Sequence, residues 1–343
     1  MIHQGYMRRC LELASKALGY ASPNPMVGAV VVCNDIIIGE GFHCKYGEPH
    51  AEVNAIRSVE NPNLLKQSTL YVNLEPCSFH GKTPPCTDLI IESQIPRVVI
   101  GSSDPNPQVA GQGVSKMRQT GIDVIENVLE KECDFLNVRY MTYHKKKRPY
   151  VLLKWAQTID GYIDIIRDGQ GQGLQPGRPT QITGWYDQTL VHKWRTEEQA
   201  IMVGTNTAMV DNPFLNVRNW NGPLPLRITI DRQLRLPNSL NLFDGSQPTL
   251  VFTEKECWAA SPAPTFNNVT YVTIPFDDFL PANILNELYK RKVISLLIEG
   301  GTQLLQSFIK AGLWDETRIL TGKKIFGNGV KAPFITINDH LTV

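Results

Sequence analysis

The chain has 343 residues, too many for one ordinary hydrophobic core, so two domains are expected. Its 42% hydrophobic and 20% charged residues are typical of a globular protein, and a net charge of +1 argues against nucleic acid or a membrane surface as a partner. Seven irregularly spaced cysteines and the lack of a membrane-length apolar run favour a cytoplasmic protein with reduced thiols.

The first half of the chain alternates helical and extended patterns. Apolar residues recur at helical spacing over residues 2–19, and the prolines of Ser22-Pro23-Asn24-Pro25 end that helix. A β-branched run at 27–33, the turn Asn34-Asp35 and a second run at 36–38 predict a hairpin. Further strands are predicted at 69–74, 98–100 and 122–125, and helices at 114–120 and 130–144. Strands that alternate with helices predict a layered α/β sheet.

Three metal-binding side chains and one carboxylate stand at predicted helix starts. His50 and Glu52 fall in one first turn, Cys77 lies at or before a helix start, and Cys86 begins another helix. One imidazole and two thiols are zinc ligands, and three protein ligands leave a fourth tetrahedral position to water, as in a catalytic site. Zinc deaminases also place a carboxylate two residues after the histidine, so Glu52 is the candidate general acid and base.

The same four residues have a structural alternative. His50 could cap its helix and the cysteines could be small buried apolar residues. Glu52 could merely favour the helix dipole as a first-turn carboxylate. A structural zinc site would require a fourth protein ligand, so the number of ligands separates the two interpretations.

The second half begins after the basic run Lys145-Lys146-Lys147-Arg148-Pro149, which we interpret as a solvated linker. The predicted domains are therefore 1–145 and 146–343. Residues 168–179 contain four glycines and two prolines and form a candidate lid. Strands are predicted from 150 and at 201–203, 226–230, 249–253, 269–274, 293–298 and 317–320, and helices at 187–197, 205–210, 284–290 and 302–311.

Two strand–glycine–helix junctions in this half are candidate phosphate sites. Gly300-Gly301 precedes the helix from Thr302, and Gly204-Thr205 is a second such junction. A helix start of this kind exposes backbone N–H groups to an anion. Neither junction is the G-x-G-x-x-G fingerprint of a standard dinucleotide-binding fold.

Motifs in both halves resemble the bifunctional riboflavin-biosynthesis deaminase–reductase family. Eight residues separate Cys77 from Cys86, where the generic deaminase pattern has two, and this longer insert is similar to the riboflavin branch. The first-half motifs are Pro23-Asn24-Pro25, Gly41-Phe42-His43, Pro49-His50-Ala51-Glu52, Glu75-Pro76-Cys77-Ser78, Thr83-Pro84-Pro85-Cys86 and Asp104-Pro105-Asn106-Pro107. The second-half motifs include Thr158-Ile159-Asp160-Gly161, Val203-Gly204-Thr205-Asn206-Thr207, Asp211-Asn212-Pro213-Phe214-Leu215 and Glu299-Gly300-Gly301.

The resemblance implies a cytidine-deaminase-like three-layer α/β/α domain followed by a dihydrofolate-reductase-like α/β domain. One zinc ion per chain would be bound by His50, Cys77 and Cys86, and Glu52 would shuttle protons during hydrolysis of a diaminopyrimidinone ribose phosphate. Five further residues would bind that substrate, against the alternatives of turn chemistry, a structural histidine and a solvated lysine: Asn24, His43, Lys82, Asp104 and Asn106.

For the second domain the resemblance implies reduction of the ribosyl group to a ribityl chain by NADPH. Substrate would be bound by Arg195, Leu215, Arg218 and Glu299, and Lys154 or Asp160 would manage protons. Arg195 and Arg218 suit a phosphate because a guanidinium donates two parallel hydrogen bonds, although surface helix arginines are the alternative. NADPH would be bound by Gln157, Thr207, Asp211, Gly301, Thr302, Gln303, Leu304, Leu305, Gln306 and Ser307.

Two departures from the family pattern concern the reductase. Pro179 and Gln181 stand where a small hydroxyl residue and an aromatic residue are usual, and the chain ends at Val343, where relatives continue with at least one more strand. A weakened reductase or a shifted sheet edge are the corresponding expectations.

The rival functions are a nucleoside or tRNA deaminase with an unrelated second domain and a non-catalytic zinc-binding protein. A homo-oligomer, dimer or tetramer, is expected, with a small-molecule substrate and no nucleic-acid or membrane partner.

Overall fold

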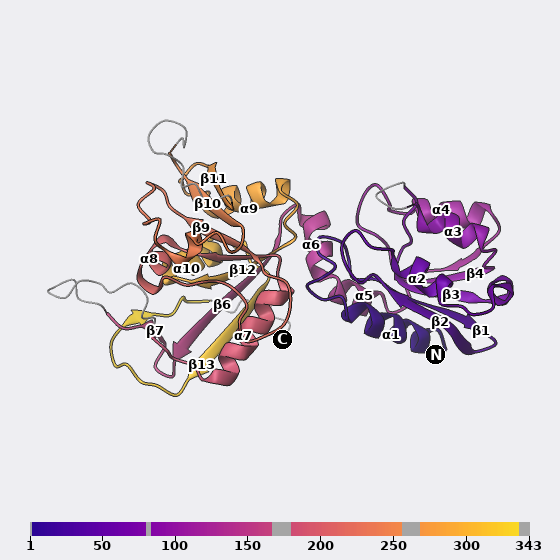
Figure 1. Cartoon of the computed structure of the whole chain (residues 1–343), viewed down its shortest axis with the longest axis horizontal. Coiled ribbons are helices and arrows are strands. Elements are labelled where there is room, and N and C mark those ends of the chain that lie inside the picture. Colours follow the sequence, from indigo (N-terminus) through magenta and orange to yellow (C-terminus); the bar gives the residue numbers. More distant parts are fainter. Residues whose placement is uncertain (1, 80–83, 167–179, 256–267, 336–343) are drawn as a thin grey trace. The chain divides into compact units, whose positions relative to one another are not determined.

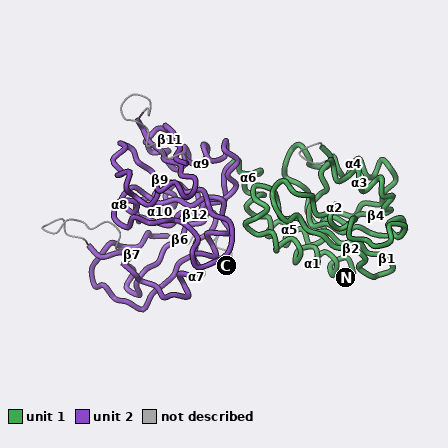
Figure 2. The backbone as a smooth tube through the Cα atoms, viewed as in Figure 1, with its two compact units in different colours: residues 1–147 green, residues 148–343 purple. Residues whose placement is uncertain are grey.

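The computed structural model describes residues 2–79, 84–166, 180–255 and 268–335. The chain divides into two compact units, Met1–Lys147 and Arg148–Val343 (Figure 2). Each unit has its own main β-sheet (Figure 1). None of the helices among the described residues combines the length and the apolar character that crossing a membrane requires.

Unit 1 is built on a five-stranded sheet with the order β2-β1-β3-β4-β5. The β1–β2 and β1–β3 pairs are antiparallel, and the remaining two pairs are parallel. Asn34 and Asp35 form the predicted hairpin turn with φ of 49° and 62°, the left-handed conformation that two-residue hairpin loops favour. The strands are β1 (Gly28–Cys33), β2 (Ile36–Phe42), β3 (Thr69–Leu74), β4 (Arg97–Ser102) and β5 (Asp123–Ile125).

Helices cover both faces of this sheet, so the predicted three-layer α/β/α architecture is confirmed. Alternate residues of β1 point to opposite faces. Ala29 and Val31 pack with residues of α2, α3 and α4, whereas Val30 and Val32 pack with residues of α1 and α5. The helices are α1 (Ile2–Ser15), α2 (Ala51–Arg57), η1 (Pro62–Gln67), α3 (Cys86–Glu92), α4 (Gln112–Gln119), α5 (Glu130–Leu136) and α6 (Val138–Lys146).

The single helix predicted at 130–144 is wrong, because the chain forms two helices that meet at Asn137. The Asn137 Oδ1 accepts the N–H of Met26 at 2.8 Å, and its Nδ2 donates to the carbonyl of Met26 at 2.9 Å. This buried side chain thus bonds both backbone groups of a residue far away in the sequence. The first helix is also shorter than predicted, since α1 ends at Ser15.

Unit 2 is built on a seven-stranded parallel sheet with the order β11-β10-β9-β8-β12-β6-β13. Its strands are β6 (Tyr150–Thr158), β8 (Ala200–Val203), β9 (Leu226–Ile230), β10 (Thr249–Thr253), β11 (Val269–Thr273), β12 (Ser295–Gly300) and β13 (Glu316–Gly322). A second, small antiparallel sheet pairs β7 (Tyr162–Asp164), which follows β6 in the chain, with β14 (Val330–Lys331), which follows β13. The sequence analysis did not predict this sheet.

The helices of unit 2 pack their apolar stripes against this sheet. Ile284 and Leu288 of α9, with Leu305 and Phe308 of α10, join one cluster with inward residues of the parallel strands. The helices are α7 (Trp185–Glu197), α8 (Thr205–Asp211), η2 (Asn241–Phe243), α9 (Leu280–Lys290) and α10 (Thr302–Lys310). The candidate lid at 168–179 lies outside the described residues.

A buried ion pair fastens the first residue of unit 2. The Arg148 guanidinium donates to both carboxylate oxygens of Asp315 at 2.5 and 2.8 Å. The same carboxylate accepts the N–H of Val151, and the two side chains are only 12% and 6% exposed. The start of β6 is therefore fixed to the residue that precedes β13.

Candidate functional site

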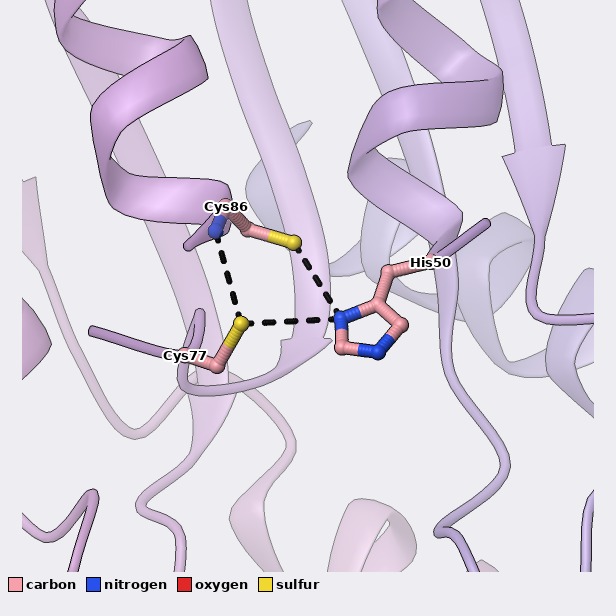
Figure 3. A group of neighbouring side chains, drawn as sticks. All are labelled: His50, Cys77 and Cys86. Carbon is pink, nitrogen blue, oxygen red and sulfur yellow. Dashed lines mark hydrogen bonds between the residues drawn. The ribbon is translucent and has the colours of Figure 1, made fainter. Parts of the chain in front are cut away.

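The predicted metal ligands converge in unit 1 (Figure 3). His50 is the N-cap residue of α2, Cys86 is the first residue of α3, and Cys77 lies in the loop after β3. The His50 Nδ1 lies 3.5 Å from the Cys77 Sγ and 3.3 Å from the Cys86 Sγ. His50 makes no side-chain capping hydrogen bond, so the alternative of a capping histidine is not supported.

These distances fit one zinc ion. A nitrogen at about 2.0–2.1 Å and a sulfur at about 2.3 Å from one ion, at a tetrahedral angle, lie roughly 3.5 Å apart. The ligand atoms of His50, Cys77 and Cys86 all lie within 4.8 Å of one another. In the described part of the chain no fourth histidine, cysteine or acidic side chain joins this group. The geometry therefore favours a three-ligand catalytic site over a structural one.

Local hydrogen bonds prepare Cys77 to be a thiolate. The Cys77 Sγ accepts the N–H of Cys86 at 3.4 Å. The helix start whose N–H groups stabilise the Cys77 thiolate is therefore that of α3. Hydrogen bonds from the Cys86 thiol and from His50 lower the pKa of Cys77, whereas the partnership with Cys77 and burial raise the pKa of Cys86. The thiolate is the form of cysteine that binds zinc, so these contacts favour Cys77 as a metal ligand.

Glu52 lies in the first turn of α2 and is only 3% exposed. Burial, and then the negative charge of Cys77, raise the pKa of this carboxyl group. A carboxyl group with a raised pKa can accept a proton and later donate it near neutral pH, which suits general acid–base catalysis. This environment is compatible with the general acid and base role that the sequence predicts for Glu52.

Asn24 and His43, two predicted substrate residues, contact one another. The Asn24 Nδ2 lies 3.1 Å from the His43 Nε2, while the His43 Nδ1 lies 3.2 Å from the carbonyl of Pro49. The His43 ring is also 5.3 Å from that of His50, edge to face. His43 is buried, and burial lowers its pKa, so a neutral imidazole fixes the position of the Asn24 amide beside the metal ligands.

Asp104 and Asn106 lie in the loop after β4, and Lys82 lies outside the described residues. The Asp104 carboxylate accepts the N–H of Asn106 at 2.8 Å and the hydroxyl of Tyr140 at 3.0 Å. Burial raises the pKa of Asp104 to about 6. The sequence analysis missed Tyr140, since one tyrosine on a helix gives no functional signal before its partner is known.

In unit 2, three predicted charged residues form one buried cluster. The Arg195 guanidinium donates to both oxygens of Glu299 at 2.9 and 2.8 Å, and the Lys154 Nζ lies 3.9 Å from the Glu299 Oε2. All three side chains are at most 12% exposed. Burial alone would raise the pKa of Glu299, but the charges of Arg195 and Lys154 outweigh it and lower this pKa to about 2.

Leu215 and Arg218 lie in the loop after α8. Leu215 is buried with φ of 47°, and Arg218 is exposed and donates to the Asn216 Oδ1 at 2.5 Å. The carbonyl of Asn216 in turn accepts a hydrogen bond from Arg195. This loop therefore lies against the charged cluster of Arg195 and Glu299.

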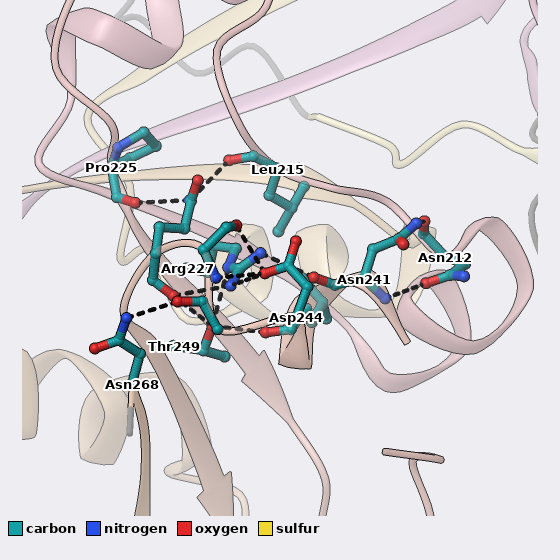
Figure 4. Close-up of polar contacts among 12 residues, drawn as sticks. Asn212, Leu215, Pro225, Arg227, Asn241, Asp244, Thr249 and Asn268 are labelled. Carbon is teal, nitrogen blue, oxygen red and sulfur yellow. Dashed lines mark hydrogen bonds and ion pairs between the residues drawn. The ribbon is translucent and has the colours of Figure 1, made fainter. Parts of the chain in front are cut away.

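A polar network centred on the fully buried Arg227 fixes the same loop (Figure 4). Arg227 donates to Thr249, Asp244 and the carbonyls of Asn241 and Gln247 at 2.8–2.9 Å. Asn241 donates two hydrogen bonds to Asn212, one from its backbone N–H and one from its side-chain amide, and Gln247 donates to the carbonyl of Leu215. The sequence analysis missed Arg227 because a strand arginine normally faces solvent.

The predicted cofactor turn begins at Gly301, which has φ of 76° and precedes α10. A Cβ at Gly300 or Gly301 would lie 3.1 Å from the Thr207 side chain, so these three residues lie next to one another. Leu304 and Leu305 are buried, Gln303 is exposed, and Ser307 donates to the carbonyl of Leu304. Asp211 ends α8.

Two side chains of the turn from Gly301 to Ser307 form hydrogen bonds with backbone groups of the segment at 331–334. Thr302 donates to the carbonyl of Lys331 at 2.7 Å. Gln306 donates to the carbonyl of Phe334 and accepts its N–H, at 3.2 and 2.9 Å. No sequence pattern indicates these contacts, which occupy the Gln306 amide.

The remaining predicted reductase residues lie along β6 and its following loop. The Gln157 Oε1 accepts the indole N–H of Trp155, and the exposed Asp160 accepts the N–H groups of Phe326 and Gly327. Of the two departures from the family pattern, Pro179 lies outside the described residues. The Gln181 carbonyl accepts a hydrogen bond from Lys324 at 2.6 Å.

Two family models match the chain. The cytidine and deoxycytidylate deaminase zinc-binding region matches residues 1–102, and the RibD C-terminal domain matches residues 149–338. The riboflavin biosynthesis protein RibD of Aquifex aeolicus is 40% identical over 96% of this chain and 89% of its own length. The RibD of Escherichia coli is 33% identical over 95% of this chain and 89% of its own length.

Solved structures agree over nearly the whole chain. A Thermotoga maritima diaminohydroxyphosphoribosylaminopyrimidine deaminase/5-amino-6-(5-phosphoribosylamino)uracil reductase has a TM-score of 0.83 and 42% identity, covering 96% of this chain and 89% of that one. Acinetobacter baumannii RibD has a TM-score of 0.84 and 31% identity, covering 99% of this chain and 92% of that one.

Proposed function

Because the chain belongs to the RibD family of riboflavin biosynthesis proteins, we propose that each of its two units performs one reaction. The chain is a bifunctional deaminase and reductase that catalyses two successive steps of riboflavin biosynthesis. Unit 1 deaminates the diaminopyrimidinone ribose phosphate, and unit 2 reduces the ribosyl group of the resulting uracil. The match of residues 149–338 to the RibD C-terminal domain disfavours the rival of a deaminase with an unrelated second domain.

The deaminase centre binds one zinc ion through His50, Cys77 and Cys86. The separations of 3.3 and 3.5 Å between the imidazole nitrogen and the two sulfurs are the observation that supports this most directly. Zinc bound there supplies Lewis acidity and lowers the pKa of a water molecule to about 7. The thiolate character of Cys77 favours metal binding near neutral pH.

Glu52 moves the protons of the deamination. It takes a first proton from the attacking water and passes it to the ring nitrogen next to the reacting carbon. It then takes the remaining proton of the new hydroxyl group and gives it to the amino group, which leaves as ammonia as the carbonyl forms. Its burial and raised pKa support both roles. Asn24, positioned by His43, binds the ring edge, and Lys82, Asp104 and Asn106 bind the ribose phosphate.

In the reductase, Arg195, Leu215, Arg218 and Glu299 bind substrate. Gln157, Thr207, Asp211 and the turn from Gly301 to Ser307 bind NADPH, which supplies the hydride when bound. The Gln306 side chain is occupied by Phe334, so this turn acts through its backbone N–H groups.

Lys154 is the stronger of the two candidates for handling protons in the reductase. Its ammonium group is buried beside Glu299, and burial lowers its pKa. The carboxylate of Asp160 is instead engaged by two backbone N–H groups of the loop at 326–327. Glu299 stabilises positive charge that develops at the sugar carbon.

We also propose a cytoplasmic homo-oligomer, a dimer or a tetramer. The cysteines within the described residues are free, as the thiolate ligands require. Trp185 and Tyr186 on α7 and Ile319 on β13 are exposed apolar side chains suited to subunit contacts. Light scattering coupled to gel filtration measures the subunit number.

One assay tests the two activities separately. The purified chain is supplied with the diaminopyrimidinone ribose phosphate, and ammonia release and NADPH oxidation are followed in parallel, with NADH as the competing cofactor. We expect ammonia release without any nicotinamide cofactor and reduction only with NADPH. Ammonia release with no cofactor oxidation under any condition would retain the zinc deaminase and refute the reductase assignment.

A further inference from the structure

A second buried carboxylate, Glu75, lies two residues before the metal ligand Cys77. It is 4% exposed and follows β3 directly. Its side chain faces the segment Asp104–Val114, from which both carboxylate oxygens accept backbone N–H groups. The Oε1 accepts those of Gly113 at 3.1 Å and Val114 at 3.4 Å, and the Oε2 accepts those of Gly111 at 3.1 Å and Asp104 at 3.4 Å.

The four N–H groups belong to both ends of one loop. Asp104 begins the loop after β4, and Gly111, Gly113 and Val114 form the start of α4. One side chain therefore closes the loop that contains Asn106. The approach is close, because a Cβ at Gly113 would lie only 2.4 Å from the carbonyl oxygen of Pro76.

The contacts continue from Glu75 to the predicted substrate residues. Glu75 binds the N–H of Asp104, and the Asp104 carboxylate binds the N–H of Asn106. Tyr140 donates to the same Asp104 carboxylate from α6. Hydrogen bonds therefore fix the loop at 104–114 to the end of β3, the strand that Cys77 follows.

We propose that Glu75 is a positioning residue of the deaminase, which holds Asp104 and Asn106 at a fixed place relative to the metal ligands so that they can bind the ribose phosphate. The proposal rests on the substrate role given above to Asn106. It predicts that loss of the Glu75 carboxylate weakens substrate binding more than it slows the chemical step.

The test compares Glu75→Gln, Asn106→Ala and the double variant in the full chain, with ammonia release measured over a range of substrate concentrations. In Glu75→Gln an amide N–H₂ replaces one acceptor oxygen and faces N–H groups. We expect the KM of each single variant to rise roughly tenfold, with a smaller change in kcat. The double variant should raise KM by less than the product of the two single effects, because both act on one loop.

Matched controls separate positioning from general damage. Glu40→Gln makes the same chemical change in unit 1 at a carboxylate paired with Arg9, and it should leave KM unchanged. Zinc content and NADPH oxidation of the preformed uracil intermediate should be unchanged in all variants. If Glu75→Gln loses zinc, the same measurements are made on Glu75→Asp, which retains the charge.

The outcomes distinguish the two proposals. An unchanged KM in Asn106→Ala refutes the substrate role of Asn106 and with it the basis of the positioning role. A raised KM in Asn106→Ala together with an unchanged KM in Glu75→Gln, or fully multiplicative effects, overturns the role of Glu75 alone. Loss of zinc in both Glu75 variants also overturns it, because Glu75 would then support the metal centre itself.

Discussion

The two units present their candidate sites in different ways. In unit 1, His50, Cys77 and Cys86 direct their ligand atoms at one point, at separations that a single ion sets. In unit 2, the charged residues Lys154 and Arg195 both pair with Glu299, and several polar side chains of the cofactor turn bind the chain's own backbone. The first site is thus defined by ligand atoms that face one point, whereas the second is stabilised by contacts within the chain.

This difference has a chemical origin. Zinc accepts few kinds of ligand at fixed distances, so the residues that bind it have little freedom. A phosphate or a nicotinamide cofactor can be bound by backbone N–H groups and by many polar side chains. We therefore expect substitutions in unit 1 to remove activity without loss of the fold, and substitutions in the charged cluster of unit 2 to affect stability as well.

The largest effect is expected from removal of a metal ligand. Cys86→Ala should reduce the zinc content from about one ion per chain to almost none and abolish ammonia release, since two ligands bind zinc poorly. NADPH oxidation of the preformed uracil intermediate should remain. Metal analysis and the two separate assays measure this, and Cys44→Ala, at an exposed free cysteine, is the matched control. Retention of zinc by Cys86→Ala would contradict the three-ligand site.

Substitution of the proton carrier should have the next largest effect. Glu52→Gln should lower kcat for ammonia release by about 10²–10⁴-fold, because a positioned acid and base contributes that much. Zinc content and reductase activity should be unchanged. Near-normal ammonia release in this variant would mean that another group moves the protons. It would also contradict the expectation that substitutions in unit 1 remove activity without loss of the fold.

In unit 2, Glu299→Gln should both destabilise the fold and inactivate the reductase. Breaking a buried ion pair leaves Arg195 and Lys154 without their counter-charge and costs about 3–5 kcal/mol of unfolding free energy. All six tryptophans lie in the second half of the sequence, so urea unfolding followed by tryptophan fluorescence reports this unit alone. Glu254→Gln removes an exposed pair with Arg232 and should cost below about 1 kcal/mol. Equal stability of the two variants would contradict the structural role of the cluster.

Acid should act on the same cluster. The pKa of Glu299 is lowered from 4.5 to about 2, so its ion pairs contribute stability that is fully present above pH 4.5 and lost as the pH falls through about 2. The shift corresponds to on the order of 3 kcal/mol. Tryptophan-monitored unfolding at several pH values between 7 and 2 should show this loss in the unaltered chain and a smaller loss in Glu299→Gln. Parallel pH curves for the two proteins would contradict the prediction that protonation of Glu299 causes the loss of stability in acid.

The smallest effect is expected at the cofactor turn. Gln306→Ala removes two hydrogen bonds to Phe334 and should cost about 1 kcal/mol of stability, with little change in the KM for NADPH. Gln303→Ala, at an exposed position of the same turn, is the matched control. A large rise in the KM for NADPH in Gln306→Ala alone would show that its side chain turns from Phe334 to the cofactor.

The sequence predicted the strands better than the contacts between distant segments. The predicted bounds of β9 and β10 are those observed, because short buried β-branched runs have a clear pattern. The break at Asn137 was missed, since its cause is Met26, which lies far away in the chain. The strands β7 and β14 were missed because two or three residues have no detectable periodicity.

The sites were predictable to the extent that residue type determines the chemistry. His50, Glu52, Cys77 and Cys86 were predicted from residue type and spacing, because few other chemistries require that set, and the ligand atoms of His50, Cys77 and Cys86 do lie within 4.8 Å of one another. Glu75, Tyr140 and Arg227 were not, since their roles depend on backbone groups that only the folded chain brings to them. For the same reason the sequence could not reveal that Gln306 binds Phe334.

The clasp between Arg148 and Asp315 determines where the reductase can be separated from the deaminase. A shortened chain that begins at Arg148 would keep both partners. One that begins at Val151 would lose the two hydrogen bonds that the Arg148 guanidinium donates to Asp315, a carboxylate only 6% exposed at the root of two neighbouring strands. Anyone who wishes to exchange one catalytic half for that of another species should therefore cut on the amino-terminal side of this arginine.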